Sequence, residues 1–167
     1  MNRPAAAAGS SFFFIAAPGT VAGLVPWWLS RWQIRPAFFG LGLVRWVGMA
    51  LVLAGLCVLL QSFARFAWEG SGTPAPVLPT KTLVVSGFYR HVRNPMYLAL
   101  VTIIFGQGLI FTHAATVAYG ALVWLVSHIF VVLYEEPALR QKFGAQYTDY
   151  CNQVPRWSPR LRGWAGA

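Results

Sequence analysis

The sequence predicts an all-α fold: a polytopic membrane protein with about four transmembrane helices. Of its 167 residues, 57% are apolar and only 10% are charged, whereas a soluble domain carries about 25% charged residues. The apolar residues are gathered into long runs, and a run of about 20 residues is enough to cross the hydrocarbon core of a bilayer. The chain length fits a single membrane domain, residues 1–167.

The first two predicted spans cover residues 11–30 and 40–63. Pro18 and Pro26 are expected to kink the first span, which membrane helices tolerate when neighbouring groups satisfy the freed carbonyls. A cleaved signal peptide is the competing interpretation of this run, and the tryptophan pair near its end argues against it. The second run is the clearest span, with Arg45 near its start able to reach the interface.

A polar connection, residues 64–94, follows the second span. Its glycines and prolines argue against a long helix. A connection of about 30 residues inside a compact domain is usually either functional or disordered. The apolar and aromatic residues near its end favour a functional loop.

The next apolar block is too long for one ordinary helix, and a turn at Thr112 and His113 divides it. This pattern predicts a helix hairpin, with helices near 96–112 and 114–134. An amphipathic helix is predicted over residues 136–152, lying on the cytoplasmic membrane surface. Its apolar side chains recur at spacings of four and three: Leu139, Phe143, Tyr147 and Tyr150.

The formal net charge is +9, and its distribution predicts the orientation. With four spans, ten basic residues fall on one side: Arg3, Arg65, Lys81, Arg90, Arg93, Arg140, Lys142, Arg156, Arg160 and Arg162. The positive-inside rule then places both termini and the 64–94 loop in the cytoplasm. The basic residues form no continuous stripe outside the membrane segments, so nucleic-acid binding is not expected. The composition suggests a bacterial inner membrane.

Neither a metal site nor a disulfide framework is expected. The three histidines, His91, His113 and His128, are scattered without ligand spacing. Cys57 lies in an apolar run and Cys151 in the polar C-terminal part.

The predicted hairpin brings two polar patches to one membrane face. The stretch GFYRHVRNPMY, residues 87–97, precedes its first helix, and Glu135 and Glu136 follow its second. Simpler interpretations exist for each residue alone: Glu136 could pair with Arg140 at i,i+4, the arginines could bind lipid phosphates, and Tyr97 could be an interfacial anchor. We favour a shared site, because adjacent carboxylates at a membrane boundary need cations or donors nearby.

Together these residues resemble the integral membrane methyltransferases related to isoprenylcysteine carboxyl methyltransferase and, more distantly, the phospholipid methyltransferases. The resemblance covers roughly residues 81–156 and lies in KTLVVSGFYRHVRNPMY, FGQG and YEEPALRQKFGAQYTDYCNQVPR. Its specificity comes from the order: G-x-Y, R-[HN]-P-x-Y, a membrane hairpin, E-E, F-G-x-x-Y-x-x-Y and V-P. The R-N-P triplet alone would be uninformative.

The resemblance implies an enzyme that transfers a methyl group from S-adenosyl-L-methionine to a lipophilic or small acceptor entering from the bilayer. The 64–94 loop would then bind the cofactor. The implied cofactor-binding residues are Lys81, Thr82, Leu83, Val84, Tyr89, Asn94, Pro95, Met96, Tyr97 and Glu135. Two more are added from their chemistry: Arg93, which can pair with a carboxylate, and Gln107, which lies between two small glycines.

No catalytic base is assigned, because methyl transfer to a carboxylate or a thiolate needs none. Glu136 and Arg93 are the catalytic candidates, with His91 as a further candidate base. Val131 stands where prenylcysteine relatives have a basic residue, which argues against a prenylcysteine substrate. Two alternatives stay open: a phospholipid or amine N-methyltransferase, and a non-catalytic scaffold that binds the headgroups of membrane lipids. The oligomeric state is open as well.

Overall fold

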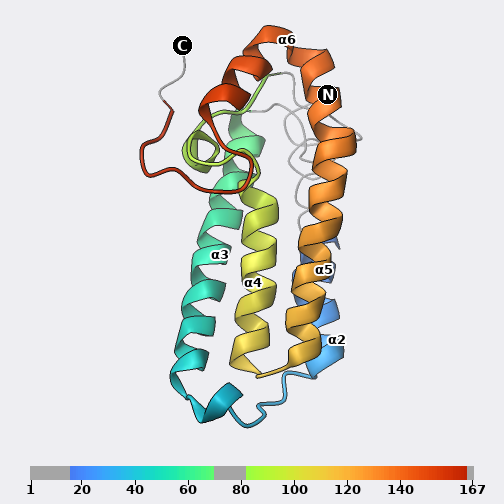
Figure 1. Cartoon of the computed structure of the whole chain (residues 1–167), viewed down its shortest axis with the longest axis vertical. Coiled ribbons are helices and arrows are strands. Elements are labelled where there is room, and N and C mark those ends of the chain that lie inside the picture. Colours follow the sequence, from blue (N-terminus) through green and yellow to red (C-terminus); the bar gives the residue numbers. More distant parts are fainter. Residues whose placement is uncertain (1–15, 70–81, 165–167) are drawn as a thin grey trace.

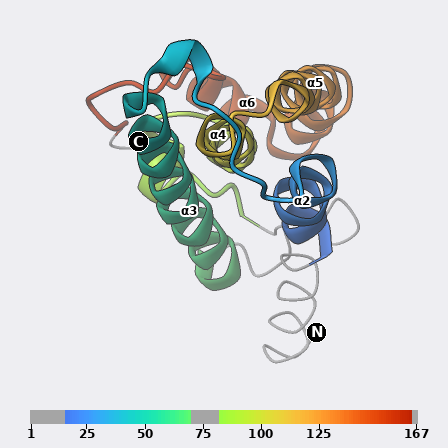
Figure 2. The ribbon, with the colours of Figure 1, turned by 90° about the horizontal axis from the view of Figure 1, so that it is seen from below.

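The computed structural model describes residues 16–69 and 82–164 of the chain. Within these ranges every regular element is helical, which confirms the all-α prediction. The long helices α3 (Leu43–Glu69), α4 (Pro95–Ile110) and α5 (Ala114–Phe130) run side by side along the molecule (Figure 1). Seen from below, α4 lies between α3 and α5, and α2 (Val25–Ser30) lies beside α4 and α5 (Figure 2).

From residue 16, the first described residue, the N-terminal segment is helical; it passes through a π-helix over Thr20–Leu24 and continues as α2. Residues 11–15 of the predicted first span lie outside the described ranges. The segment ends where Arg31 and Trp32 adopt left-handed φ angles of 51° and 53°. A short 3-10 turn, Phe38–Gly40, then leads into α3.

Helix α3 is longer than the sequence predicted. The expected span ended at residue 63, with a loop from residue 64, but the helix continues to Glu69. Residues 64–69, ARFAWE, contain neither glycine nor proline, so nothing in the local sequence ends the helix before Gly70. The start of the predicted loop is therefore wrong by six residues.

The long helices carry apolar surface, as a bilayer requires. Among the described residues, two helical stretches are long and apolar enough to cross a membrane, Leu43–Arg65 and Ala114–Gln153, and α4 is a shorter apolar helix. Large apolar side chains are exposed along α3 and α5, including Leu53, Leu60, Leu122 and Leu125. The chain is an integral membrane protein, and the count of four spans stays a prediction.

Glycines allow α3 and α4 to pack closely. A Cβ atom on Gly106 would lie 2.7 Å from the carbonyl oxygen of Gly48, and one on Gly48 would lie 2.7 Å from the carbonyl oxygen of Gly106. Small residues at helix contacts are typical of membrane bundles, because they let the backbones approach. In the FGQG motif, Gly106 therefore serves helix packing.

The turn between α4 and α5 lies where the sequence predicted it. Thr112 has a left-handed φ of 54°, and His113 caps α5 by accepting a hydrogen bond from the Thr116 amide at 3.3 Å. The hairpin of α4 and α5 is confirmed, with its first helix ending at Ile110 rather than at residue 112.

Helix α5 continues without a loop into a π-helix, Val131–Glu135, and then into α6, Glu136–Gln153. Pro137 explains the π-helix, because its ring would clash with the carbonyl four residues earlier in a regular α-helix. Helix α6 bends over the end of the bundle (Figure 1). A kink at Gly144, where φ is 53°, divides α6, which the sequence had predicted as one regular helix.

The predicted apolar face of α6 packs against the protein itself. Tyr147, Tyr150 and Val154 are buried together, with Leu83 and Trp164 packed against them. Leu139 and Phe143 border the same cluster. The prediction that these apolar side chains of α6 lie on one face is confirmed. The position of α6 on a membrane surface stays a prediction.

Candidate active site

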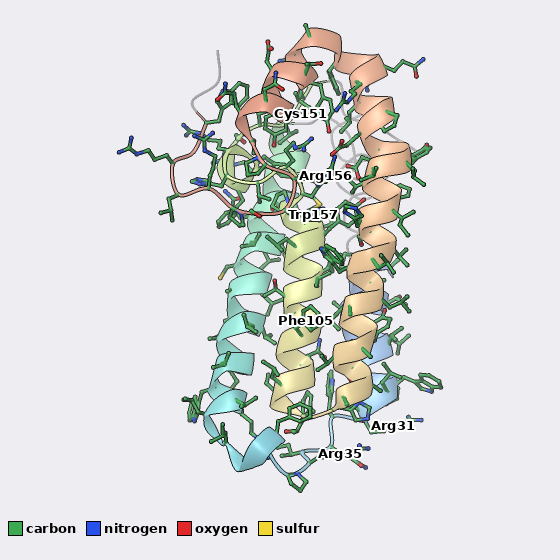
Figure 3. The ribbon with its side chains drawn as sticks, viewed as in Figure 1. Arg31, Arg35, Phe105, Cys151, Arg156 and Trp157 are labelled. Atoms are coloured by element: carbon green, nitrogen blue, oxygen red, sulfur yellow. The ribbon has the colours of Figure 1, made fainter. Side chains whose placement is uncertain are left out.

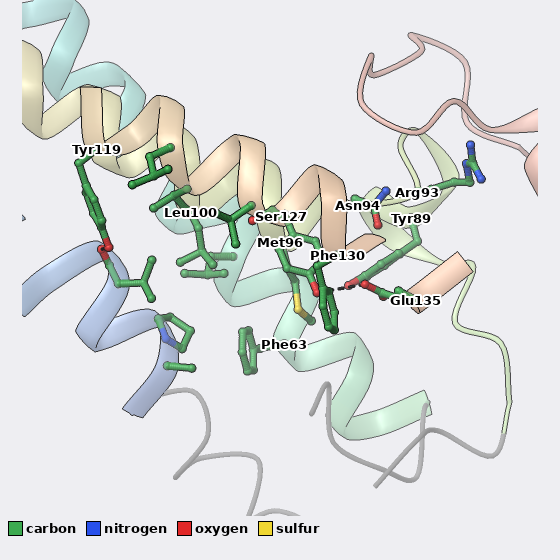
Figure 4. A pocket seen from close by; sticks show the side chains of 18 residues that line it. Phe63, Tyr89, Arg93, Asn94, Met96, Leu100, Tyr119, Ser127, Phe130 and Glu135 are labelled. Carbon is green, nitrogen blue, oxygen red and sulfur yellow. Dashed lines mark hydrogen bonds between the residues drawn. The ribbon is translucent and has the colours of Figure 1, made fainter. Parts of the chain in front are cut away.

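A cavity of about 540 Å³ lies between the N-terminal helical segment, α3, α4 and α5. It has a polar end near the start of α4 and an apolar remainder that extends along α5 (Figure 4). The polar lining comes from the loop before α4, the first turn of α4 and the end of the π-helix: Tyr89, Arg93, Asn94, Tyr97 and Glu135. Both polar patches identified in the sequence therefore line one cavity.

The hydroxyl of Tyr97 donates a hydrogen bond to Glu135 Oε2 at 3.0 Å. Glu135 faces the cavity because of the π-helix. On α5 the lining residues recur at helical spacing up to Phe130, and a regular α-helix would present residue 134 next. The extra residue of the π turn presents Glu135 instead and leaves Tyr134 exposed.

Glu136, the neighbouring acid, is turned away from the cavity and held by two arginines. Its carboxylate accepts one hydrogen bond from Arg93 at 3.1 Å and two from Arg156, at 2.5 and 3.0 Å. The side chains of Arg93 and Glu136 are only 11% and 7% exposed. The hydrogen bonds to Glu136 raise the pKa of Arg156, so the pair stays charged.

The Arg93 side chain points away from the cavity (Figure 4). Its guanidinium bonds Glu136 and also contacts Cys151 Sγ at 2.8 Å. The sequence had assigned Arg93 to a cofactor carboxylate. In the structure its charge is already balanced by Glu136.

The C-terminal tail, residues 154–164, covers the outer side of the polar end. Asn94 Nδ2 donates to the carbonyl of Arg156 at 3.2 Å, and the amide of Arg93 donates to the carbonyl of Pro155 at 2.9 Å. Trp157 fixes the tail to α5, because its indole nitrogen donates to His128 Nδ1 at 2.9 Å. The tail thereby orients the Asn94 side chain.

Tyr89 sits on a 3-10 turn, Gly87–Arg90, that presents its ring to the cavity (Figure 4). Its carbonyl accepts a hydrogen bond from the Tyr150 hydroxyl at 2.6 Å. Burial, and then the charge of Glu135, raise the pKa of the Tyr89 phenol, so it remains a neutral donor. Gly87 has a φ of 58°, and a Cβ atom there would lie 2.3 Å from Gln61 Nε2.

Not every residue assigned from the sequence reaches the cavity. Met96 lines it with the polar residues named above, and Pro95 is buried at the first position of α4. Outside the lining are Thr82, Leu83, Val84, His91, Gln107, Val131 and Glu136. Lys81 lies outside the described residues.

The structure gives several of these residues other partners. Gln107 Nε2 donates to the carbonyl of Ala22 at 2.6 Å, and Gln107 Oε1 accepts from the Trp32 indole at 3.3 Å. His91 Nδ1 lies 2.8 Å from the carbonyl oxygen of Arg160 in the tail. Val131, which stands where prenylcysteine relatives have a basic residue, is buried and is not among the residues that line this cavity.

Sequence reasoning missed the cations that balance Glu136 and most of the apolar wall. Arg156 belonged to the quoted VPR triplet, but its pairing depends on a chain reversal after α6 that no local pattern shows. Phe63 and Tyr119 also line the cavity. Their spacing is that of ordinary membrane helices, so the sequence carried no signal for them.

Comparison with known proteins identifies the family of the chain. A sequence model of the phospholipid methyltransferase family matches residues 38–146, which include α3, α4, α5, the second π-helix with Glu135, and the first part of α6. The chain belongs to this family. It is also 32% identical over 80 residues to protein-S-isoprenylcysteine O-methyltransferase B of Arabidopsis thaliana. That alignment covers 46% of this chain and 39% of the plant protein, so the chain matches well under half of its relative.

Proposed function

We propose that the protein is a membrane-embedded methyltransferase that uses S-adenosyl-L-methionine and methylates a lipophilic acceptor. The observation that carries the proposal is the Tyr97–Glu135 pair, 3.0 Å apart, at the polar end of a cavity whose remainder is apolar. Membership of the phospholipid methyltransferase family supports the same activity. The methyl donor and the acceptor would meet where the two parts of the cavity join.

The residues at the polar end fit such a cofactor. Glu135 can accept hydrogen bonds from ribose hydroxyls or an ammonium group, and the rings of Tyr89 and Tyr97 suit adenine or a sulfonium cation. The first turn of α4 also begins here, and the positive end of its dipole favours a carboxylate. When bound, the cofactor would supply an electrophilic methyl group.

The chain's own residues would bind and orient the cofactor and the acceptor, and they would exclude water. Asn94 is held by the tail through its amide nitrogen, so its amide oxygen faces the cavity (Figure 4). Arg93 and Glu136, the catalytic candidates from the sequence, are placed to fix the loop and the tail around the site. A dry apolar wall on the other side would keep water from the reacting atoms.

As part of the same proposal, the polar end faces the cytoplasm of a bacterial inner membrane. Arg156 and Trp157 lie at this end of the bundle, and Arg31 and Arg35 lie at the opposite end (Figure 3). The larger number of basic residues at the end with the tail supports a cytoplasmic position.

Binding of S-adenosylhomocysteine, the demethylated cofactor, tests the proposal. We expect the purified protein to bind it, and Glu135→Ala to weaken binding at least tenfold, because a charge-assisted hydrogen bond contributes about 1.5–3 kcal/mol. Isothermal titration calorimetry measures both. Leu133→Ala is the matched control, since Leu133 lies in the same π-helix and its side chain is 73% exposed.

An absence of heat and of thermal stabilisation with the wild-type protein would contradict the proposal and favour the lipid-binding scaffold. The acceptor is identified by incubating membrane lipid extracts with the protein and isotope-labelled S-adenosylmethionine. Mass spectrometry of the labelled product then distinguishes O-, S- and N-methylation, and thereby an isoprenylcysteine-like from a phospholipid or amine acceptor.

A further inference from the structure

The apolar part of the cavity is a slot that follows one face of α5. The α5 residues that line it recur at spacings of three, one, three, one and three: Tyr119, Leu122, Val123, Val126, Ser127 and Phe130. Eleven residue steps separate the first from the last, or about 17 Å of helix at ~1.5 Å per residue. Figure 4 shows Tyr119 at one end and Glu135 at the other.

The end of the slot at Tyr119 is closed. The hydroxyl of Tyr119 donates a hydrogen bond to the carbonyl of Val21 on the N-terminal π-helix, at 3.1 Å. Val21 and Tyr119 pack against a buried cluster that includes Ala22 and Ile104, and Ile104 is fully buried. The Gln107 amide holds the same turn of the N-terminal segment through Ala22.

The side of the slot is accessible from the surface of the bundle. Leu122 and Val126 line the cavity and are nevertheless 55% and 57% exposed. A surface of this kind on a membrane helix faces hydrocarbon. A lipid chain can therefore enter from the side while the far end stays blocked.

We propose that Tyr119, bridged to the carbonyl of Val21, sets the length of hydrocarbon chain that the slot accepts. One chain of the acceptor lies along α5, its reactive head beside Glu135 and its terminal carbons against the Tyr119 ring. The slot follows a single face of α5, so only one chain lies along it and any second chain stays in the bilayer. This inference rests on the proposed function and names its specificity determinant.

The probe is hexadecanoic acid with a photoreactive diazirine at its terminal carbon, added to the full-length protein in lipid nanodiscs. Cross-linked residues are mapped by mass spectrometry. We expect labelling at the closed end of the slot, on Tyr119 or on Val21, with which it bonds. Labelling spread evenly over outward-facing residues of α3, such as Leu53 and Leu60, would overturn the proposal.

Unlabelled saturated fatty acids of increasing length then compete with the probe. Each further methylene that packs against the wall of the slot should strengthen competition, up to the length at which the chain meets Tyr119. In the Tyr119→Ala variant, competition should keep increasing to longer chains than in the wild-type protein. In the Tyr119→Trp variant, the increase should stop at shorter chains. Tyr119→Phe keeps the ring but loses the bond to Val21, so it should shift the limit less than Tyr119→Ala does. Equal limits in all four proteins would refute the assignment.

Circular dichroism checks that each variant is helical, and the alanine and tryptophan changes give opposite shifts, so loss of one variant leaves the other as the test. The competition needs no cofactor. Failure to bind S-adenosylhomocysteine would therefore count against the proposed activity alone, and an unchanged chain-length limit would count against the role of Tyr119 alone.

Discussion

At the scale of single residues, two adjacent glutamates have different tasks. Glu136 is buried and balanced by Arg93 and Arg156, whereas Glu135 meets the Tyr97 hydroxyl and faces the cavity. A buried carboxylate is tolerated when cations and donors surround it. Removing one member of such a cluster leaves the other charges buried without a partner.

We therefore expect Glu136→Ala to lower the free energy of unfolding by about 3 kcal/mol, the usual loss when a buried pair is broken. Equilibrium unfolding in detergent micelles, followed by circular dichroism, measures this change. Asp149→Ala is the control, because Asp149 is exposed on the same helix; its effect should stay within about 0.5 kcal/mol. Equal losses in both variants would contradict a structural role for Glu136.

At the scale of elements, proline creates both π-helices. The segment Thr20–Leu24 ends two residues before Pro26, and Val131–Glu135 ends two residues before Pro137. In each case the wider turn accommodates a ring that a regular α-helix would reject. Both π-helices contribute to the cavity, one through Val21 and the other through Glu135.

The register of the second π-helix should decide ligand binding. Inserting one alanine after Val132 would rotate Glu135 by about 100° around the helix axis, and the bond to Tyr97 would be lost. We expect binding of S-adenosylhomocysteine to fall at least tenfold while the helical circular dichroism persists. Leu133→Ala, which keeps the register, should bind as the wild-type protein does. An insertion variant with unchanged affinity would argue against the placement of Glu135.

At the scale of the whole molecule, the site assembles from four regions of the chain. The loop before α4, the end of α5, the start of α6 and the tail meet at one end of the bundle (Figure 3). The other end carries Arg31, Arg35 and the tryptophans near them. This asymmetry makes the orientation in the membrane testable.

We expect a cysteine at Ser158 to face the cytoplasm and one at Gln33 to face the opposite side; both positions are exposed. The background is Cys57→Ser with Cys151→Ser, which removes the native thiols. A membrane-impermeant maleimide should label Gln33→Cys in intact cells and Ser158→Cys after the membrane is permeabilised. The reverse pattern would invert the topology and place the cavity's polar end outside.

The sequence predicted those parts of the fold and of the site that depend on residues close together in the chain. The turn at Thr112 and His113 and the start of α6 at Glu136 were predicted because glycine, proline and apolar runs act over a few residues of chain. The end of α3 was placed too early, because the apolar run was taken to end before Arg65, whereas residues 64–69 contain no helix breaker. Of the residues assigned to the cofactor, Tyr89, Asn94, Tyr97 and Glu135 line one cavity and Gln107 does not. Their role in cofactor binding stays a prediction.

The sequence by itself determined the helical class, the order of the helices and the two polar patches that approach each other, because hydropathy and proline act locally. The tertiary structure decided which glutamate faces the cavity, which arginines balance the other, and where Tyr119 closes the slot. These outcomes depend on contacts between segments that are distant in the chain, such as Arg156 with Glu136 and Tyr119 with Val21. Packing of whole helices sets those contacts, and no local pattern encodes it.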